Sequence, residues 1–155
     1  MVCVPPGWTF HLAPDSIELV LLPPDGPDST ERVTFTRWAK DGPSRDYLAV
    51  AQQLATSAFF GFGPAEADTL NQLVFPHDFA VERNVGLRAQ GQAYRAYCLV
   101  YVDDQNVYQL RIILAQARLQ AYRGDLLRDI IGNLQIDRKY FVEHANQLKQ
   151  IIHLR

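Results

Sequence analysis

Three stretches of the chain alternate between apolar and polar residues with the period of a half-buried β-strand. The first is RVTFTRW, in which one face carries Val33, Phe35 and Arg37. The other two, QAYRAYCLVYV and NVYQLRIILAQARL, flank the turn-forming residues DDQN and predict an antiparallel hairpin. In the second strand of this hairpin one face is apolar and the other, which includes Gln109, is mixed; the apolar residues are Tyr108, Leu110, Ile112 and Leu114. We therefore expect a sheet with one covered face and one partly hydrated face.

Two further regions have strand character. The apolar run from Ile17 to Leu22 is followed by the turn-rich PPDGPDS at 23–29, which predicts a hairpin or short meander with RVTFTRW. Between residues 70 and 91 the pattern is less regular. LNQLVF favours a strand, PHDF a turn, and AVERNVGLRAQG either a strand or a loop.

Three segments have helical spacing. The first begins after Ser44, a predicted N-cap, and ends near Phe60, where Gly61 can take the left-handed conformation of a C-cap. Its apolar stripe is Tyr47, Ala51, Leu54 and Ala58. The second covers about 125–134, is capped by Asp125, and buries Leu127, Ile130, Ile131 and Leu134. The third covers about 137–155, is capped by Asp137, and has the stripe Phe141, Ala145, Leu148 and Ile152.

The predicted order of strands, helix, strands, helix and helix indicates the α+β class, an antiparallel sheet with helices packed on it. A chain of 155 residues is expected to form a single domain, with the core at about 5–136 and an extra C-terminal helix. The apolar stripe of that helix predicts either a homodimer through the helix or packing against its own sheet.

Composition and charge argue against several classes of protein. With 48% hydrophobic and 21% charged residues the chain is typical of a globular protein. Its net charge is −2 and it has no basic stripe, so we expect no nucleic-acid binding. It has no apolar run near the length that spans a membrane. The opening MVCVPPGW lacks the regions of a signal peptide, so we expect a cytoplasmic protein. A leader or lipid anchor removed from this sequence would leave the same pattern.

Catalytic and metal-binding patterns are missing from the sequence. The sequence has four histidines: His11, His77, His144 and His153. Their spacing does not bring two or more of them together as metal ligands. Cys98 lies in an apolar strand, and Asp103–Asp104 lies at a hairpin tip where acidic residues satisfy turn amides. GFGPAE follows a helix, whereas a dinucleotide loop follows a strand. We therefore expect no enzyme, no metal and no cofactor.

Phenylalanines gather between residues 59 and 79, and these are Phe59, Phe60, Phe62, Phe75 and Phe79. Adjacent Phe59 and Phe60 cannot share one helix stripe, because successive side chains are about 100° apart. Two interpretations stay open. The rings close one end of the core, or they form a partly exposed apolar patch that binds a partner or a lipid-like ligand.

The chain resembles the PsbP/DcrB-like superfamily, which includes the Eag chaperones of type VI secretion. The resemblance rests on PPGWTFHLAPDSIELVLLPP as an opening hairpin, RVTFTRWAKDGPSRDYLAVAQQLATSAF as strand plus helix, and the block AYRAYCLVYV to GNLQI as late hairpin and helix. It implies an antiparallel sheet between helices, with binding rather than catalysis as the usual role.

The leading functional hypothesis is a non-enzymatic protein-binding module, such as a chaperone, adaptor or immunity-type partner, that uses the phenylalanine-rich segment. The alternative is a pocket protein that binds an apolar small molecule between the sheet and a helix. A third hypothesis is a small enzyme whose site is assembled from distant loops.

Overall fold

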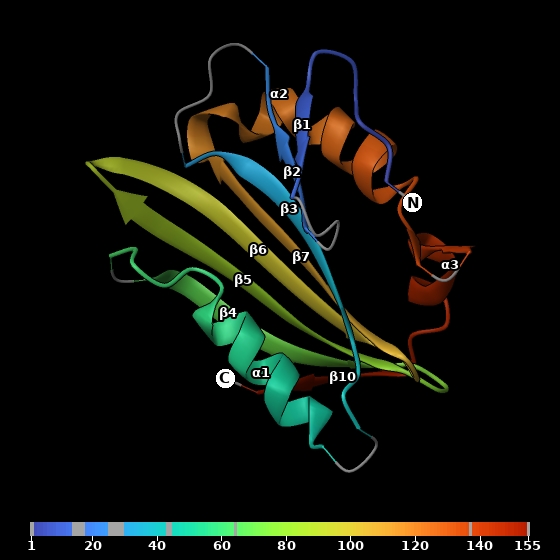
Figure 1. The fold of residues 1–155 in the computed structure, drawn as a ribbon. Helices are drawn as coiled ribbons and strands as arrows, with labels where there is room; N and C mark the ends of the chain where they lie inside the picture. Colours follow the sequence, from blue (N-terminus) through green and yellow to red (C-terminus); the bar gives the residue numbers. More distant parts are fainter. Residues whose placement is uncertain are drawn as a thin grey trace.

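The computed structural model describes residues 2–13, 18–24, 30–42, 45–63, 65–136 and 138–154. Within these residues the chain forms an eight-stranded antiparallel sheet in the order β1-β2-β3-β7-β6-β5-β4-β10 (Figure 1). The strands are β1 Thr9–Leu12, β2 Glu18–Leu22, β3 Arg32–Ala39, β4 Glu66–Val74, β5 Phe79–Ala89, β6 Gln92–Val102, β7 Asn106–Ala115 and β10 Gln150–His153. The predicted α+β class is confirmed.

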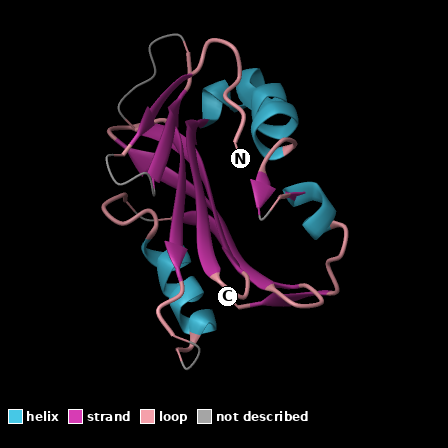
Figure 2. Cartoon of the chain, turned by 45° about the vertical axis from the view of Figure 1, so that its right-hand side comes forward, coloured by secondary structure: helices cyan, strands magenta, loops and turns pink. Residues whose placement is uncertain are grey.

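Helices cover both faces of the sheet (Figure 2). Helix α1 (Tyr47–Ser57) packs on β5 and β6 from one side. On the other side lie a continuous helical layer and a short two-stranded ribbon. The layer consists of a 3₁₀ turn (Gln116–Arg118), α2 (Leu119–Gly124) and a π-helical segment, η2 (Asp125–Ile131); the ribbon is β8 (Gln135–Ile136) with β9 (Lys139–Tyr140).

Two hydrophobic cores follow from this layering. On β6, Tyr94, Cys98 and Val100 pack toward α1, while Leu99 and Tyr101 pack toward the helical layer. The expectation of a partly hydrated face is therefore wrong at the centre of the sheet. Gln109 is only 7% exposed, and its amide donates to the Leu54 carbonyl at 3.4 Å. A polar side chain is tolerated there because it is hydrogen-bonded.

The hairpin β6–β7 lies where the sequence predicts it. Strand β4 begins at Glu66, before the favoured LNQLVF, and AVERNVGLRAQG, for which the sequence leaves both a strand and a loop open, belongs mainly to strand β5. Helix α1 is also as predicted, except at its start. Ser44 lies outside the described residues, and the N-cap is Asp46, whose Oδ1 accepts a hydrogen bond from the Ala49 amide at 3.1 Å. Gly61 has φ +96°, the left-handed conformation expected after the helix.

The second helical region begins before Asp125, the predicted cap. Arg118 is the N-cap of α2, and the Asp125 carboxylate accepts a hydrogen bond from the Trp8 indole instead. The buried side chains also differ from the prediction, since Leu126 is buried and Leu127 is 53% exposed. A π-helical turn holds more residues than an α-helical one, so it shifts which side chains face the core.

The C-terminal helix is present only at α3 (Phe141–Ala145), and the predicted cap Asp137 lies outside the described residues. Residues Gln150–His153 form β10, which pairs with β4, so Ile152 belongs to a strand and the predicted helical stripe does not form. The Lys149 amide donates to the Val74 carbonyl and the Leu154 amide to the Leu70 carbonyl, each at 2.8 Å. These bonds satisfy the backbone of an otherwise open sheet edge.

Candidate functional site

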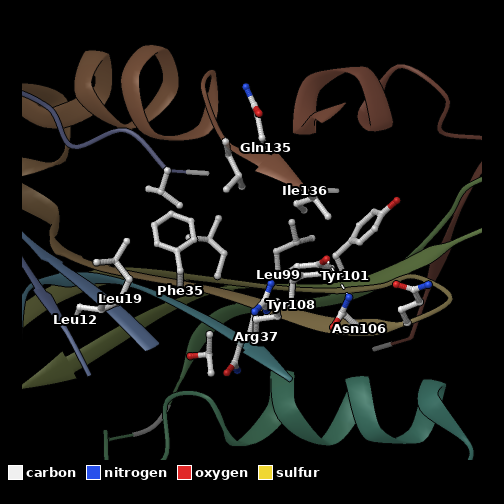
Figure 3. Close-up of a pocket in the computed structure, with 16 residues that line it drawn as sticks. Leu12, Leu19, Phe35, Arg37, Leu99, Tyr101, Asn106, Tyr108, Gln135 and Ile136 are labelled. Atoms are coloured by element: carbon white, nitrogen blue, oxygen red, sulfur yellow. Dashed lines mark hydrogen bonds between the residues drawn. The ribbon is translucent and has the colours of Figure 1, made fainter. Parts of the chain in front are cut away.

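A cavity of about 520 Å³ lies between the sheet and β8 (Figure 3). Its floor comes from the sheet, where Leu19, Phe35 and Leu99 supply apolar side chains. Above it lies β8, whose Ile136 points toward the sheet while the Gln135 amide points away from it. The remaining walls come from Val2, Leu12, Thr36, Arg37, Tyr101, Gln105, Asn106, Tyr108, Gln109, Leu110 and Leu134. We call this the first cavity.

Tyrosine hydroxyl groups provide polar contacts at the β6–β7 end of the first cavity. The Tyr101 hydroxyl donates to Asp78 Oδ2 at 2.6 Å, and Asn106 Nδ2 donates to the Tyr108 hydroxyl at 3.4 Å. Burial, followed by the hydrogen bond to Asp78, raises the pKa of Tyr101 far above its usual range. Tyr101 is therefore a neutral hydrogen-bonding group near neutral pH.

A second cavity of about 560 Å³ lies beside the first, between the sheet and the α2–η2 layer. The two cavities share Leu99 and Leu110, the central side chains of this sheet face. The second cavity is otherwise lined by Asn84, Arg95, Ala96, Tyr97, Ile112, Leu119, Gln120, Arg123, Leu126, Leu127, Ile131 and Phe141. Its interior is mainly aliphatic, and its exposed lining residues, such as Gln120 and Leu127, mark the opening to solvent.

The charged residues among the described linings of both cavities are all cationic: Arg37, Arg95 and Arg123. This distribution differs from that of the whole chain, which has more acidic than basic residues. Arg95 Nη2 donates to Asn84 Oδ1 at 2.7 Å, which is a neutral partner.

A row of hydrogen-bonded polar side chains borders the second cavity on β4, β5 and β10. The Tyr97 hydroxyl donates to Glu82 Oε2 at 2.8 Å, and Asn71 Nδ2 donates to Glu82 Oε1 at 3.2 Å. His153 Nδ1 lies 2.6 Å from Asn71 Oδ1, so the row reaches the last strand. Burial and the adjacent Glu82 raise the pKa of Tyr97, which keeps its hydroxyl protonated as the donor.

The five phenylalanines predicted as a partner site do not form one surface. Phe59 is buried in the core under α1, where Phe62 and Phe79 also pack, whereas Phe75 is buried in the core on the opposite face of the sheet. Phe62 contacts Tyr94 edge-on at 6.5 Å between ring centroids. Phe60 is 93% exposed.

The side chains considered for catalysis in the sequence, Cys98 and Asp103, have environments that suit packing and turn formation. Burial raises the pKa of Cys98 to about 11, so its thiol is a poor nucleophile near neutral pH. Asp103 Oδ1 accepts the amides of Gln105 and Asn106 at 2.8 and 2.7 Å, which confirms its predicted turn role. Within the described part of the chain no three His, Cys, Asp or Glu side chains gather as a metal site.

The cavities could not be located from the sequence, although one signal pointed toward them. The apolar face of the second hairpin strand, predicted from Leu110 and Ile112, does form part of their floor. The residues that cover this floor come from separate segments of the chain. A local sequence pattern does not predict the distance between a helical layer and a sheet.

These features define an α+β protein with a mainly apolar, cationic space between its sheet and one helical layer. No helix in the described residues has both the length and the apolar character needed to cross a membrane. Comparisons with protein-family models and with curated proteins find no match.

Solved structures do resemble the chain. LpqN of Mycobacterium tuberculosis, described as involved in cell envelope biogenesis, has a TM-score of 0.55 at 12% identity over 99% of this chain and 82% of LpqN. PA94, a protein of unknown function from Pseudomonas aeruginosa, has a TM-score of 0.44 at 13% identity over 78% of this chain and 92% of PA94. Cyanobacterial PsbP (CyanoP) from Synechocystis has a TM-score of 0.45 at 9% identity over 92% of each chain. The likeness to LpqN is one of fold alone.

Proposed function

We propose that this protein is a non-enzymatic binding protein that holds an apolar ligand between its sheet and the segments that cover this face, the α2–η2 layer and β8. The observation that supports this function is the pair of adjoining cavities, about 520 and 560 Å³, that meet at Leu99 and Leu110. Each lies within the size range of small-molecule sites, which are mainly apolar with a few placed polar groups. The described linings have that character, with aliphatic floors and with tyrosine, asparagine and arginine at their edges.

Displacement of a neutral fluorescent dye tests this function. N-phenyl-1-naphthylamine should gain fluorescence with the protein, and dodecanol should displace it. Leu110→Phe fills space at the junction of the cavities and should weaken dye binding. Overpacking a core can cost about 1–3 kcal/mol of stability, so Leu110→Phe could also unfold the protein. Leu127→Ala changes an exposed side chain at the opening of the second cavity, and it should weaken dye binding without this cost. Phe60→Ser is the matched control, since Phe60 does not line either cavity.

Native mass spectrometry of protein purified from its own host gives an independent readout. A bound species of lipid size that is lost on organic extraction supports the proposal. A protein that binds neither dye nor dodecanol, while its circular dichroism shows it folded, contradicts it.

Binding of a partner protein is a second candidate function, favoured by the exposure of one aromatic side chain. Phe60 follows α1 and is 93% exposed, whereas Phe59 beside it is 5% exposed. Large aromatic side chains that are isolated from the core are typical anchors of protein interfaces. Of the five phenylalanines proposed for partner binding, Phe60, with Phe62 beside it, is the accessible part.

Partner capture with wild-type protein and with a Phe60→Ser/Phe62→Ser variant tests this second function. Loss of a captured partner by a folded variant supports it, and an unchanged set of partners contradicts it.

A homodimer through the C-terminal segment is a related proposal, with exposed Val142, Leu148 and Ile151 as its surface. Sedimentation at two protein concentrations tests it.

A further inference from the structure

The opening of the second cavity combines an apolar interior with two arginine side chains. Arg95 reaches it from β6 and Arg123 from α2, so the cations come from the two layers that enclose the cavity. Deeper in, the lining is aliphatic, with Ile112 and Leu126 buried. A ligand that matches both regions has a hydrocarbon part and a charged end.

The arrangement of Arg95 leaves it able to bind a further group. One guanidinium nitrogen, Nη2, donates to the neutral Asn84 side chain at 2.7 Å. Its other nitrogen, Nη1, lies over Gly86 of β5, 3.4 Å from where a Cβ would be, and Glu66 of β4 borders the same glycine. The remaining N–H donors form the planar fork that suits carboxylate and phosphate.

Arg123 is exposed on α2 and makes no ion pair within the described part of the chain. Its neighbour along the layer, Arg128, differs, because it pairs with Asp129 at 2.9 Å and does not line the cavity. Two carboxylates on the same sheet face lie outside the described lining: Glu82, which accepts hydrogen bonds from Tyr97 and Asn71, and Glu66, which pairs with Arg88 at 3.5 Å. The described lining of the second cavity therefore contains two cations, Arg95 and Arg123, and no carboxylate.

We propose, building on the ligand-binding function above, that the ligand is an anionic amphiphile. Its hydrocarbon chain lies in the second cavity, and its carboxylate or phosphate head is bound by Arg95 and Arg123 at the opening. The apolar interior provides affinity for the chain, and the two guanidinium groups select the charge of the head.

A set of ligands with one chain and different heads tests this proposal. Dodecanoate, dodecyl phosphate, dodecanol and dodecyltrimethylammonium compete with neutral N-phenyl-1-naphthylamine, each below its micelle concentration. Hydrogen bonds to charged groups are stronger than neutral ones, so the two anions should bind about tenfold tighter than dodecanol. The cation should bind more weakly than dodecanol. The preference for anions should decrease as salt is added, because the opening is exposed.

An Arg95→Gln/Arg123→Gln variant should lose the preference for anions and retain dodecanol binding. Arg128→Gln, which removes a neighbouring arginine outside the cavity, should keep it. Inorganic phosphate alone should not displace dodecyl phosphate at comparable concentration; if it does, the head binds without the cavity and the proposal is wrong. If dodecanol binds as tightly as the two anions, the charge selection is wrong while the ligand-binding function stands. If no member of the set binds, the ligand-binding function itself is wrong.

Discussion

The indole Nε1 of Trp8 donates a hydrogen bond of 2.9 Å to Oδ2 of Asp125 in the η2 segment. Trp8 is 6% exposed, and its ring meets that of Tyr122 edge-on at 5.6 Å. The Tyr122 hydroxyl in turn donates to the Pro24 carbonyl at 3.0 Å. These contacts join the N-terminal segment and the end of the β2 region to the helical layer. They hold in place the layer that encloses the second cavity.

The first prediction concerns this hydrogen bond. Trp8→Phe keeps an aromatic ring and removes the donor, which leaves a partly buried carboxylate without this partner. We expect the free energy of unfolding, measured with urea, to fall by about 1–3 kcal/mol. The matched control is Asp129→Asn, which alters the exposed pair with Arg128 and should change the free energy by less than about 1 kcal/mol. Equal effects from both variants would contradict the importance of the Trp8 bond.

The second prediction concerns the ion pair between β4 and β5. Arg83 Nε and Nη2 each donate to one oxygen of Asp68 at 3.0 Å, and Nη1 donates to the Thr56 carbonyl at 3.0 Å. The two side chains are only 10% and 17% exposed. Asp68→Ala leaves a buried cation, so the free energy of unfolding should fall by about 3–5 kcal/mol.

The control for this ion pair lies on the same strand. Glu66 and Arg88 form a pair of 3.5 Å whose side chains are 66% and 60% exposed. Glu66→Ala should therefore cost less than about 1 kcal/mol in the same urea experiment. If Asp68→Ala costs no more than Glu66→Ala, the buried Arg83–Asp68 pair stabilises the protein no more than an exposed pair does.

The sequence predicts those parts of this structure that depend on local periodicity. The β6–β7 hairpin has a polar turn between two long apolar strands, and α1 has one apolar stripe with Gly61 after it. The bond between Trp8 and Asp125 could not be predicted in the same way, because its partners are 117 positions apart. Only the folded layers bring them together.

The C-terminal segment shows why local periodicity can also mislead. Phe141, Ala145, Leu148 and Ile152 have helical spacing, but Ile151 and Ile152 are β-branched and suit a strand. The segment becomes a strand because Gln150–His153 pairs with the edge strand β4. An edge that needs a partner is a property of the sheet and is not visible in the segment itself.

The third prediction concerns the stability of the protein at alkaline pH. Burial raises the pKa of both Tyr97 and Tyr101, and the hydrogen bonds to Glu82 and Asp78 raise it further. Unfolded tyrosines release their protons near pH 10, where these two stay protonated in the folded protein. Their stabilising effect is therefore complete below about pH 10 and is lost as the pH rises above it. The expected loss is about 1.4 kcal/mol per pH unit for each tyrosine.

Urea unfolding at a series of alkaline pH values measures this slope, and Tyr101→Phe should make it shallower. A titration of tyrosinate absorbance gives the matching result. In the native protein Tyr97 and Tyr101 should resist ionisation, and in concentrated guanidinium chloride both should ionise near pH 10. A native titration with no resistant tyrosine would contradict the neutral hydroxyl groups assigned to both cavities.

The fourth prediction distinguishes the two cysteines by their reaction with a thiol reagent. Burial raises the pKa of Cys98 to about 11, its side chain is 0% exposed, and Gln109 Nε2 lies 3.6 Å from its sulfur. At pH 8 its thiolate fraction is therefore on the order of 0.1%, and the reagent reaches it only when the sheet opens. Cys3 is partly exposed in the N-terminal segment. Native protein should show one fast-reacting thiol, a Cys3→Ser variant should show none, and unfolding should release the slow one. A fast reaction in Cys3→Ser would mean that α1 does not seal this face of the sheet.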